Sequence, residues 1–334
     1  MKYKLKVTII MLIFFILAQL IGLLVTASYK EYFYVKEKLP RQINQSNLTN
    51  ITKVTKTNLS LTKEFIPEKI EIKSSIDFVQ IIASFLVALV IATVVFIILM
   101  RIGVIRVMRA WLFLVVLIGL FISFSLILYI LTKESVKIFN IYVSIAEIIA
   151  LVFAFLLAYY KIYKRDIIIH NLSELFIYPG IVVLFLPLVN IYIALALLLL
   201  VSIYDVIAVF KTRHMQKMAK FMIKDVRAFT GLLFPWIDKK EKIKLERIKK
   251  KAKGRKVKIK INIAALGGGD IALPMLFANV VFLTFGLINA LFVILFATIG
   301  LALLLLFGRR DKAYPALPPL ALGSIIGYLI GFLI

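Results

Sequence analysis

The sequence contains no cysteine and only two histidines among its 334 residues. The absence of cysteine excludes disulfide bonds, thiolate metal centres and cysteine nucleophiles. Two histidines leave too few ligands for a histidine-based metal site. We therefore expect neither a metal ion nor another cofactor.

Charged residues are also scarce, at 18% of the chain, whereas hydrophobic residues make up 62% and the mean hydropathy is +1.00. Large soluble domains are nearer to half apolar, so this composition excludes a water-soluble protein and requires a surface that faces lipid. Acidic residues are scarcer than basic ones, with 17 Asp and Glu against 42 Lys and Arg, which gives a net charge of +25. The parts of the chain that face water are therefore strongly basic.

Nine apolar stretches, each of about the 20 residues that cross a bilayer as a helix, predict an all-α polytopic membrane protein. The first stretch also fits a secretory signal peptide, but its apolar run is longer than is usual for one, so we expect it to be retained. The predicted spans lie near residues 7–28, 77–100, 110–132, 139–160, 168–188, 190–210, 262–284, 286–307 and 314–334.

The distribution of basic residues predicts the orientation, because cytoplasmic loops carry an excess of Lys and Arg. With the N-terminus inside, 31 Lys and Arg fall on the inner side and 11 on the outer side. We therefore expect a multi-pass protein of the cell membrane with a cytoplasmic N-terminus and an external C-terminus. The loop 29–75 carries four Asn-x-Ser/Thr sequons between residues 44 and 60, which agrees with an external position.

The long inner loop, 211–260, has two halves of different composition. Between residues 221 and 236, apolar and basic residues are mixed, which is typical of a helix lying in the membrane interface. Residues 239–260 are mostly Lys and Arg. Attraction to anionic lipid explains this charge more simply than nucleic-acid binding does, so we expect the bilayer, and no nucleic acid, as the partner of the loop.

A charged side chain within a span is unfavourable and usually marks function. Among the carboxylates in predicted spans, three stand out: Glu147, Asp205 and Asp270. Asp205 lies six residues before Lys211, or about 9 Å along a helix. Asp270 lies ten residues after the basic loop, which would be about 15 Å in a continuous helix. If the seventh helix starts near Ala264, both aspartates lie about two turns inside the inner boundary and can face each other.

The chain around Asp270 is expected to depart from regular helix. Residues 257–263 alternate apolar and polar side chains, which is strand periodicity, although chance alternation in a basic flank gives the same pattern. Three glycines directly before Asp270 weaken a helix and allow a partner backbone to approach. Close packing of helices through small residues is the other explanation of these glycines.

The last predicted span opens with prolines at positions 315, 318 and 319, directly after a basic inner turn. Proline lacks the N–H group and disfavours helix in the residue before it. We therefore expect an irregular start to this helix at the inner depth of the two aspartates, where such backbone is tolerated only against protein or water. A plain proline-rich helix start is the simpler alternative.

Two facing carboxylates in a low-dielectric site do not ionise together easily, so they share a proton. The ionised group can accept a proton from water while the protonated group polarises a peptide carbonyl. This is the chemistry of aspartic proteases, and it requires neither a metal ion nor a covalent intermediate.

Three short motifs occur in order on the sixth, seventh and ninth predicted spans. They are Tyr204-Asp205, Gly267-Gly268-Gly269-Asp270 and Pro315-Ala316-Leu317. Together they resemble the YD, GxGD and PAL motifs of presenilin and signal peptide peptidase. The resemblance covers the last four spans, and the earlier spans match in number only. It implies an intramembrane aspartyl protease in which Asp205 and Asp270 are catalytic and the other motif residues shape the active site.

The resemblance also implies a presenilin-like bundle, with a transmembrane scaffold over 1–188 and a catalytic part over 189–334. The inner position of loop 211–260 is similar to presenilin rather than to the inverted signal peptide peptidase, which implies single-span substrates with an external N-terminus. The substrates would be transmembrane proteins or peptides. The lack of cysteine and of any animal-type loop suggests a microbial homologue that needs no partner subunit.

If the protein is an intramembrane protease, the alternating segment 257–263 can serve to bind the substrate. A helical substrate hides its peptide bonds, so it must be unwound before cleavage. We expect an extended edge containing Ile259 and Ile261 to pair with the unwound substrate by strand addition and to present the scissile bond beside Asp270.

A proton- or cation-coupled transporter or channel is the main alternative, because broken helices with acids near the midplane suit ion binding. It does not explain the proline motif, and no paired inverted halves are visible. The missing His-Glu-x-x-His motif excludes a metalloprotease. A rhomboid-type serine protease is disfavoured because we interpret His170 and His214 as ordinary interfacial residues. Glu147 fits no motif, and we expect it to pair within the bundle or to reach an aqueous cavity.

Overall fold

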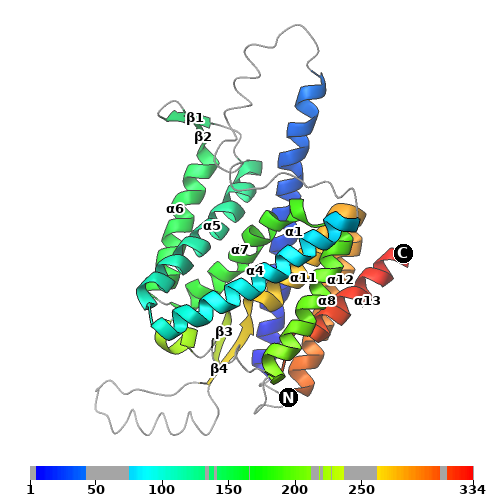
Figure 1. Cartoon of the computed structure of the whole chain (residues 1–334). Helices are drawn as coiled ribbons and strands as arrows, with labels where there is room; N and C mark the ends of the chain where they lie inside the picture. The colour runs from blue at the N-terminus through cyan, green and yellow to red at the C-terminus, as the bar shows by residue number, and fades with distance from the viewer. Residues whose placement is uncertain are drawn as a thin grey trace.

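The structure is a computed structural model that describes residues 5–42, 75–131, 135–138, 141–164, 166–211, 218, 221–226, 228–236, 262–308 and 314–333. These residues form nine α-helices and two two-stranded antiparallel sheets (Figure 1). The helices are α1 (Leu5–Gln42), α4 (Ser75–Ile102), α5 (Ile105–Leu131), α6 (Ile145–Tyr159), α7 (Ile167–Phe185), α8 (Ile191–Val206), α11 (Gly268–Phe285), α12 (Leu287–Phe307) and α13 (Leu317–Leu333). The strands are β1 (Ser135–Ile138), β2 (Ile141–Ser144), β3 (Gly231–Trp236) and β4 (Asn262–Gly267).

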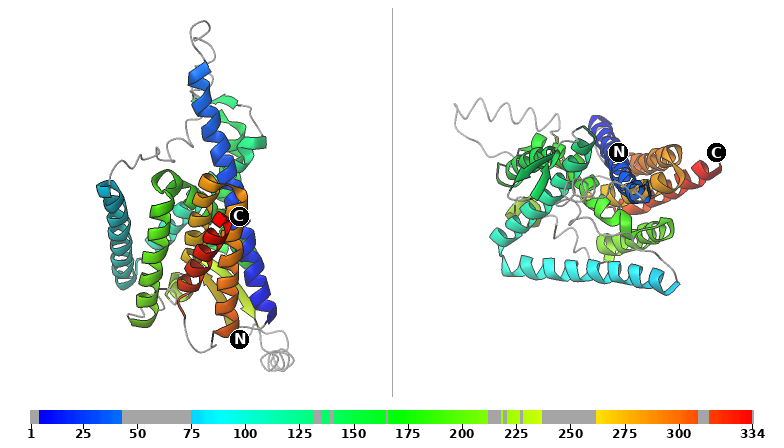
Figure 2. Two further views of the ribbon diagram at one scale, coloured as in Figure 1. Left: turned by 90° about the vertical axis from the view of Figure 1, so that its right-hand side faces the viewer. Right: turned by 90° about the horizontal axis from the view of Figure 1, so that it is seen from above.

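Eight helical segments in this part of the chain are long and apolar enough to cross a membrane, and α13 is a shorter apolar helix of 17 residues. The predicted all-α polytopic membrane fold is therefore confirmed. The helices pack as a bundle, and α4 lies along its outside (Figure 2). No residue between 77 and 102 is fully buried, so α4 is the most exposed of the described spans.

Two predicted spans begin several residues later than expected. The span predicted from residue 139 begins as α6 at Ile145, because β1 and β2 form a hairpin in which Ser135 lies opposite Ser144. The span predicted from residue 262 begins as α11 at Gly268, because β4 occupies the preceding six residues. The extended segment predicted at 257–263 is thus observed only from residue 262, and its earlier part lies outside the described residues.

Glu147 has a structural role that the sequence did not indicate. Ser144 caps α6, and the backbone N–H of Ser144 donates to Glu147 Oε2 at 3.3 Å in a capping box. This arrangement satisfies N–H groups that a helix start otherwise leaves without partners. Glu147 lies within a span, as predicted, but in its first turn, because α6 starts at Ile145 and not near residue 139.

The prediction of an interfacial helix between residues 221 and 236 is wrong for the second half of this segment, which forms β3. A short π-helical turn covers Met222–Val226, and β3 then pairs with β4 in a register that places Gly231 opposite Gly267. Leu232 and Phe234 are buried while Pro235 is exposed, so burial alternates along the segment as it does in a strand. The pairing partner lies about 30 residues further along the chain, beyond the reach of any local pattern.

Glycines allow close contacts between the helices α12 and α13. A Cβ atom at Gly327 would lie 2.4 Å from the backbone oxygen of Phe292, and one at Gly323 would lie 2.2 Å from that of Phe296. Both contacts join α13 to α12. Since the obstructing atoms belong to backbone, they cannot move aside, and only glycine permits this approach. The α12–α13 pair is thereby held as one closely packed unit.

Candidate active site

Asp205 lies in the last turn of α8 and is 4% exposed. Its Oδ2 accepts a hydrogen bond of 3.2 Å from the backbone N–H of Leu317, the first residue of α13. The first N–H groups of a helix have no partner within the helix, and a carboxylate interacts favourably with the positive end of the helix dipole. Asp205 therefore holds the start of α13 against the end of α8.

The proline motif forms the irregular helix start that was predicted. Residues 314–316 are not helical, and α13 begins at Leu317 rather than at residue 314. Pro315 and Leu317 are buried, whereas Ala316 is half-buried. Because the prolines delay the helix, the N–H group of Leu317 is left to donate to Asp205.

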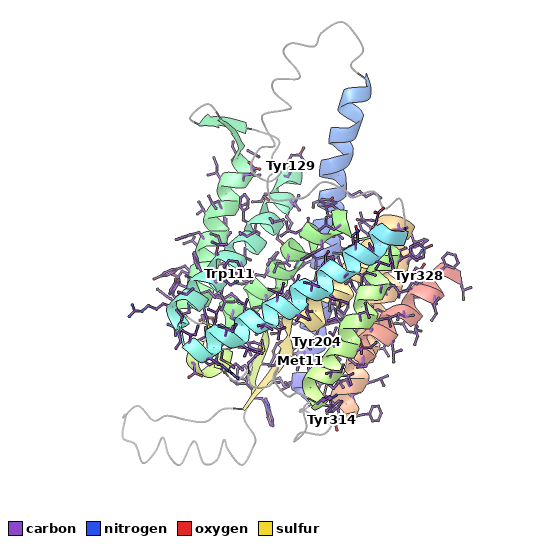
Figure 3. All side chains as sticks on the ribbon, viewed as in Figure 1. Met11, Trp111, Tyr129, Tyr204, Tyr314 and Tyr328 are labelled. Carbon is purple, nitrogen blue, oxygen red and sulfur yellow. The ribbon has the colours of Figure 1, made fainter. Side chains whose placement is uncertain are left out.

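Tyr204, the other residue of its motif, points toward a different helix. Its hydroxyl lies 3.2 Å from Thr93 Oγ1 of α4, within hydrogen-bonding distance. Tyr204 lies at the same end of the bundle as Tyr314, which precedes the proline motif (Figure 3). The motif thus joins α8 both to α13, through Asp205, and to α4, through Tyr204.

Asp270 lies in the first turn of α11 and is 8% exposed. The helices α8 and α11 pack against each other and run in opposite directions. The last turn of α8 and the first turn of α11 are therefore at the same end of the bundle (Figure 1). Pro274 has no N–H to donate to the carbonyl of Asp270, so the helix around Asp270 departs from a regular hydrogen-bond ladder.

The three glycines before Asp270 have three different surroundings. A Cβ at Gly267 would lie 3.0 Å from Asp270 Oδ2, and one at Gly268 would lie 2.8 Å from the ring and hydroxyl of Tyr178. Apart from its chain neighbours and the backbone of its own helix, no described atom lies within 4 Å of a Cβ built at Gly269. Glycine is thus required sterically at position 268, is tightly placed at 267 and is unconstrained at 269.

The chain matches the profile of one protein family, described as signal-peptide peptidase and presenilin aspartyl protease, over residues 56–334. It belongs to the signal-peptide peptidase and presenilin aspartyl protease family. Members of this family are proteases of the aspartyl type, and the protein is accordingly an intramembrane aspartic endopeptidase whose substrates lie in the bilayer. Nothing favours the transporter alternative.

Solved structures of similar fold agree with this assignment. One presenilin family intramembrane aspartate protease in space group C222 matches with a TM-score of 0.58 and 16% identity, covering 98% of each chain. Another, in space group P2, matches with a TM-score of 0.54 and 17% identity, covering 97% of this chain and 96% of the other. No curated protein sequence matches the chain.

The interpretation of His170 as an ordinary interfacial residue is wrong, because this side chain is 7% exposed. Its Nε2 lies 2.8 Å from the carbonyl oxygen of Gly231, and its Nδ1 lies 3.2 Å from Lys161 Nζ. These contacts occupy both ring nitrogens without a serine, so they do not revive the serine-protease alternative. His214, Ile259 and Ile261 lie outside the described residues.

Sequence reasoning also missed the polar face of α7. Lys161 forms a buried ion pair with Glu174, one helical turn from His170. Next to His170, the Asn171 side chain donates to the carbonyl of Leu233 at 2.8 Å and accepts from its N–H at 2.9 Å. A search for acids and bases at spacings of four residues within the fifth predicted span would have found His170 and Glu174.

Proposed function

We propose that Asp205 and Asp270 are the catalytic pair of this intramembrane aspartyl protease. The observation that carries the proposal is the hydrogen bond from Leu317 to Asp205. It joins the proline motif to the end of α8, while Asp270 opens the neighbouring helix α11. All three motifs thus belong to one end of the bundle, and both carboxylates are buried where water is scarce.

The proposed reaction is the addition of water to a substrate peptide bond. The ionised carboxylate of the pair takes a proton from water as the water oxygen attacks the carbonyl carbon. The protonated carboxyl group donates its proton to the carbonyl oxygen, which gives a neutral tetrahedral diol. The C–N bond then breaks when the first carboxyl group gives its proton to the leaving nitrogen, and the diol returns a proton to the second carboxylate.

A cleavage assay in liposomes with purified protein tests the proposal. We expect the wild-type protein alone to cleave a single-span substrate, and the double variant Asp205→Asn, Asp270→Asn to cleave it at least about a thousandfold more slowly. The same liposomes are tested for proton and cation flux. Flux without cleavage by the wild type would overturn the proposal in favour of a transporter. Cleavage only after addition of a second protein would contradict the expectation that no partner subunit is needed.

We further propose that the outer edge of β4 binds the unwound substrate. The Asn171 side chain bonds the N–H and C=O of Leu233 from the side away from β4, so Leu232 and Phe234 are the residues that bond β4. The register then directs the backbone groups of Ile263, Ala265 and Gly267 away from β3. No other described strand pairs with β4 along this edge, which leads directly to Asp270 and suits strand addition.

Proline substitutions along this edge test the substrate strand. Ala265→Pro removes an N–H that faces away from β3, so the β3–β4 pairing should survive. We expect about a tenfold loss of cleavage, because one main-chain hydrogen bond to the substrate is lost. Ile259→Pro and Ile261→Pro test the continuation of the edge that the sequence predicts. Ala265→Val keeps the N–H and is the control; unimpaired cleavage in all three proline variants would contradict the proposal.

We propose that the N-terminus is cytoplasmic and the C-terminus external in the cell membrane, with a scaffold over 1–188 and a catalytic part over 189–334. The missing cysteines allow a direct test, since one introduced cysteine is the only label site. A membrane-impermeant maleimide added to intact cells should label Ser46→Cys and leave Leu245→Cys unlabelled. The reverse labelling would contradict this orientation and the expected substrates with an external N-terminus.

A further inference from the structure

A buried polar cluster on the scaffold side of β3 is not used by the proposed chemistry. Lys161, in the π-helical turn Tyr160–Lys164 after α6, is paired with Glu174 of α7, and each side chain is 1% exposed. Lys161 Nζ also contacts His170 Nδ1. A buried ion pair adds little to stability compared with well-packed apolar residues, so its presence here suggests a role in fixing geometry.

The contact between His170 and Gly231 fixes the state of the imidazole ring. A carbonyl oxygen only accepts, so Nε2 must carry the hydrogen that it donates to Gly231. Nδ1 then has a lone pair that accepts from the Lys161 ammonium group. The ion pair with Glu174 holds that ammonium in place. The three side chains therefore orient one N–H group at the first carbonyl of β3.

The backbone of Gly231 lies close against the backbone of β4, so the position of Gly231 affects that of β4. Gly231 has a φ of 137°, and a Cβ there would lie 2.3 Å from the carbonyl oxygen of Leu266. It is paired with Gly267, three residues before Asp270. Backbone of β3 thus lies directly against the chain that enters α11. A shift of Gly231 cannot be absorbed by side chains and must move Leu266 and Gly267.

A second contact from α7 reaches the same stretch. Tyr178 packs against Gly268. It lies two turns beyond His170 on α7. His170, Glu174 and Tyr178 follow one another at intervals of four residues, so they share one face of the helix. One face of α7 therefore contacts the start of β3 and the start of α11.

We propose that Lys161, His170 and Glu174 form a positioning unit that sets the register of substrate cleavage. By holding Gly231, the unit fixes where β4 ends and where Asp270 lies along a bound substrate strand. None of the three residues is assigned a contact with substrate, so they act through β3. This inference rests on the proposed catalytic role of Asp270 and on the proposed substrate edge.

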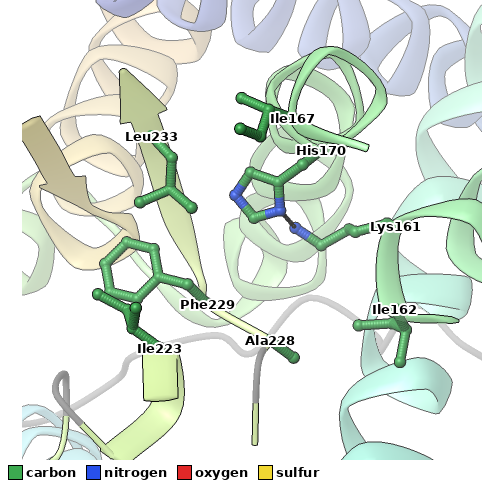
Figure 4. A pocket seen from close by; sticks show the side chains of 8 residues that line it. All are labelled: Lys161, Ile162, Ile167, His170, Ile223, Ala228, Phe229 and Leu233. Atoms are coloured by element: carbon green, nitrogen blue, oxygen red, sulfur yellow. Dashed lines mark hydrogen bonds between the residues drawn. The ribbon is translucent and has the colours of Figure 1, made fainter. Parts of the chain in front are cut away.

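A cavity beside the cluster leaves room for a substitution at His170. The cavity of about 260 Å³ is lined by Lys161 and His170 together with apolar residues that include Phe229 and Leu233 (Figure 4). The somewhat larger ring of His170→Phe can be accommodated there. This change keeps both partners of the Lys161–Glu174 pair and removes the donor to Gly231 together with the acceptor for Lys161.

The experiment compares His170→Phe and His170→Gln in the full-length protein. The glutamine side chain of the second variant retains a donor at the position of Nε2 and an acceptor for Lys161. We expect His170→Phe to lower kcat/KM about tenfold, as the loss of the hydrogen bond to Gly231 suggests, and to spread cleavage over neighbouring peptide bonds. Mass spectrometry of the products reads the cleavage positions. We expect His170→Gln to restore the wild-type positions.

Ser173→Ala is the matched control, because the Ser173 hydroxyl donates to the carbonyl of Ile169 within its own helix, α7. A simple loss of folded protein would reduce all products in proportion, so unchanged cleavage positions in His170→Phe would overturn the inference. Spread positions in both the Phe and the Gln variant would also overturn it, since the donor would then be irrelevant. Absence of cleavage by the wild type would instead contradict the proposed function itself.

Discussion

Asp270→Asn is expected to reduce substrate cleavage at least about a thousandfold, because Asn has the shape of Asp but cannot exchange a proton with water or substrate. Asp205→Asn should cause a comparable loss. The amide oxygen of the asparagine introduced in that variant still accepts the hydrogen bond from Leu317, so α13 should stay in place. The loss can therefore be assigned to chemistry rather than to folding.

The measurement is the initial rate of cleavage of a single-span substrate in liposomes at equal amounts of incorporated protein. The double variant should be no slower than either single variant, since groups that act as a unit are not additive. Glu147→Gln is the control, because Gln also serves in a capping box. Cleavage by Asp270→Asn within tenfold of wild type would contradict the catalytic assignment.

Gly268→Ala is expected to lower the cleavage rate about a hundredfold, which is the effect of displacing a reacting group by about 1 Å. The new Cβ would lie 2.8 Å from the buried ring of Tyr178, so either the ring or the start of α11 must move. Asp270 lies two residues further along and moves with it. The change acts on geometry, and the amount of folded protein should fall much less than the activity.

Gly269→Ala provides the matched control within the same motif. Open space surrounds its Cβ, and Ala favours the helical conformation over Gly, so the rate should stay within about twofold of wild type. Combining Gly268→Ala with Tyr178→Leu removes the obstructing ring and should recover part of the activity, which a double-mutant cycle measures. Equal rates for the two alanine variants would contradict this steric account.

The predicted membrane helices and the family were correct because both depend on local features. A run of apolar residues needs no partner to identify a span, and the three motifs are contiguous in the chain. The prediction of an irregular backbone before Leu317 also succeeded, since proline acts on its own residue and its neighbour. The membrane helices, the three motifs and the irregular start of α13 could be predicted because each is determined by residues adjacent in the chain.

The features that were missed depend on contacts between distant residues. β3 was taken for a helix because its partner β4 lies beyond a long basic loop. The burial of His170 follows from Gly231 and Lys161, which come from two other elements. The capping role of Glu147 was not predicted, because the hairpin before α6 was not predicted. Contacts between residues that are distant in the chain leave no periodic pattern in the sequence.

The contacts of Gly323 and Gly327 with α12 have a consequence for how a membrane-embedded substrate reaches the two aspartates that we propose to be catalytic. Backbone lies against backbone along this pair of helices, so parting them would open a void that lipid tails fill poorly. A lateral passage is easier to form beside α4, which has no fully buried residue between 77 and 102. Substrate admission should therefore depend more on the mobility of α4 than on that of the closely packed α12 and α13.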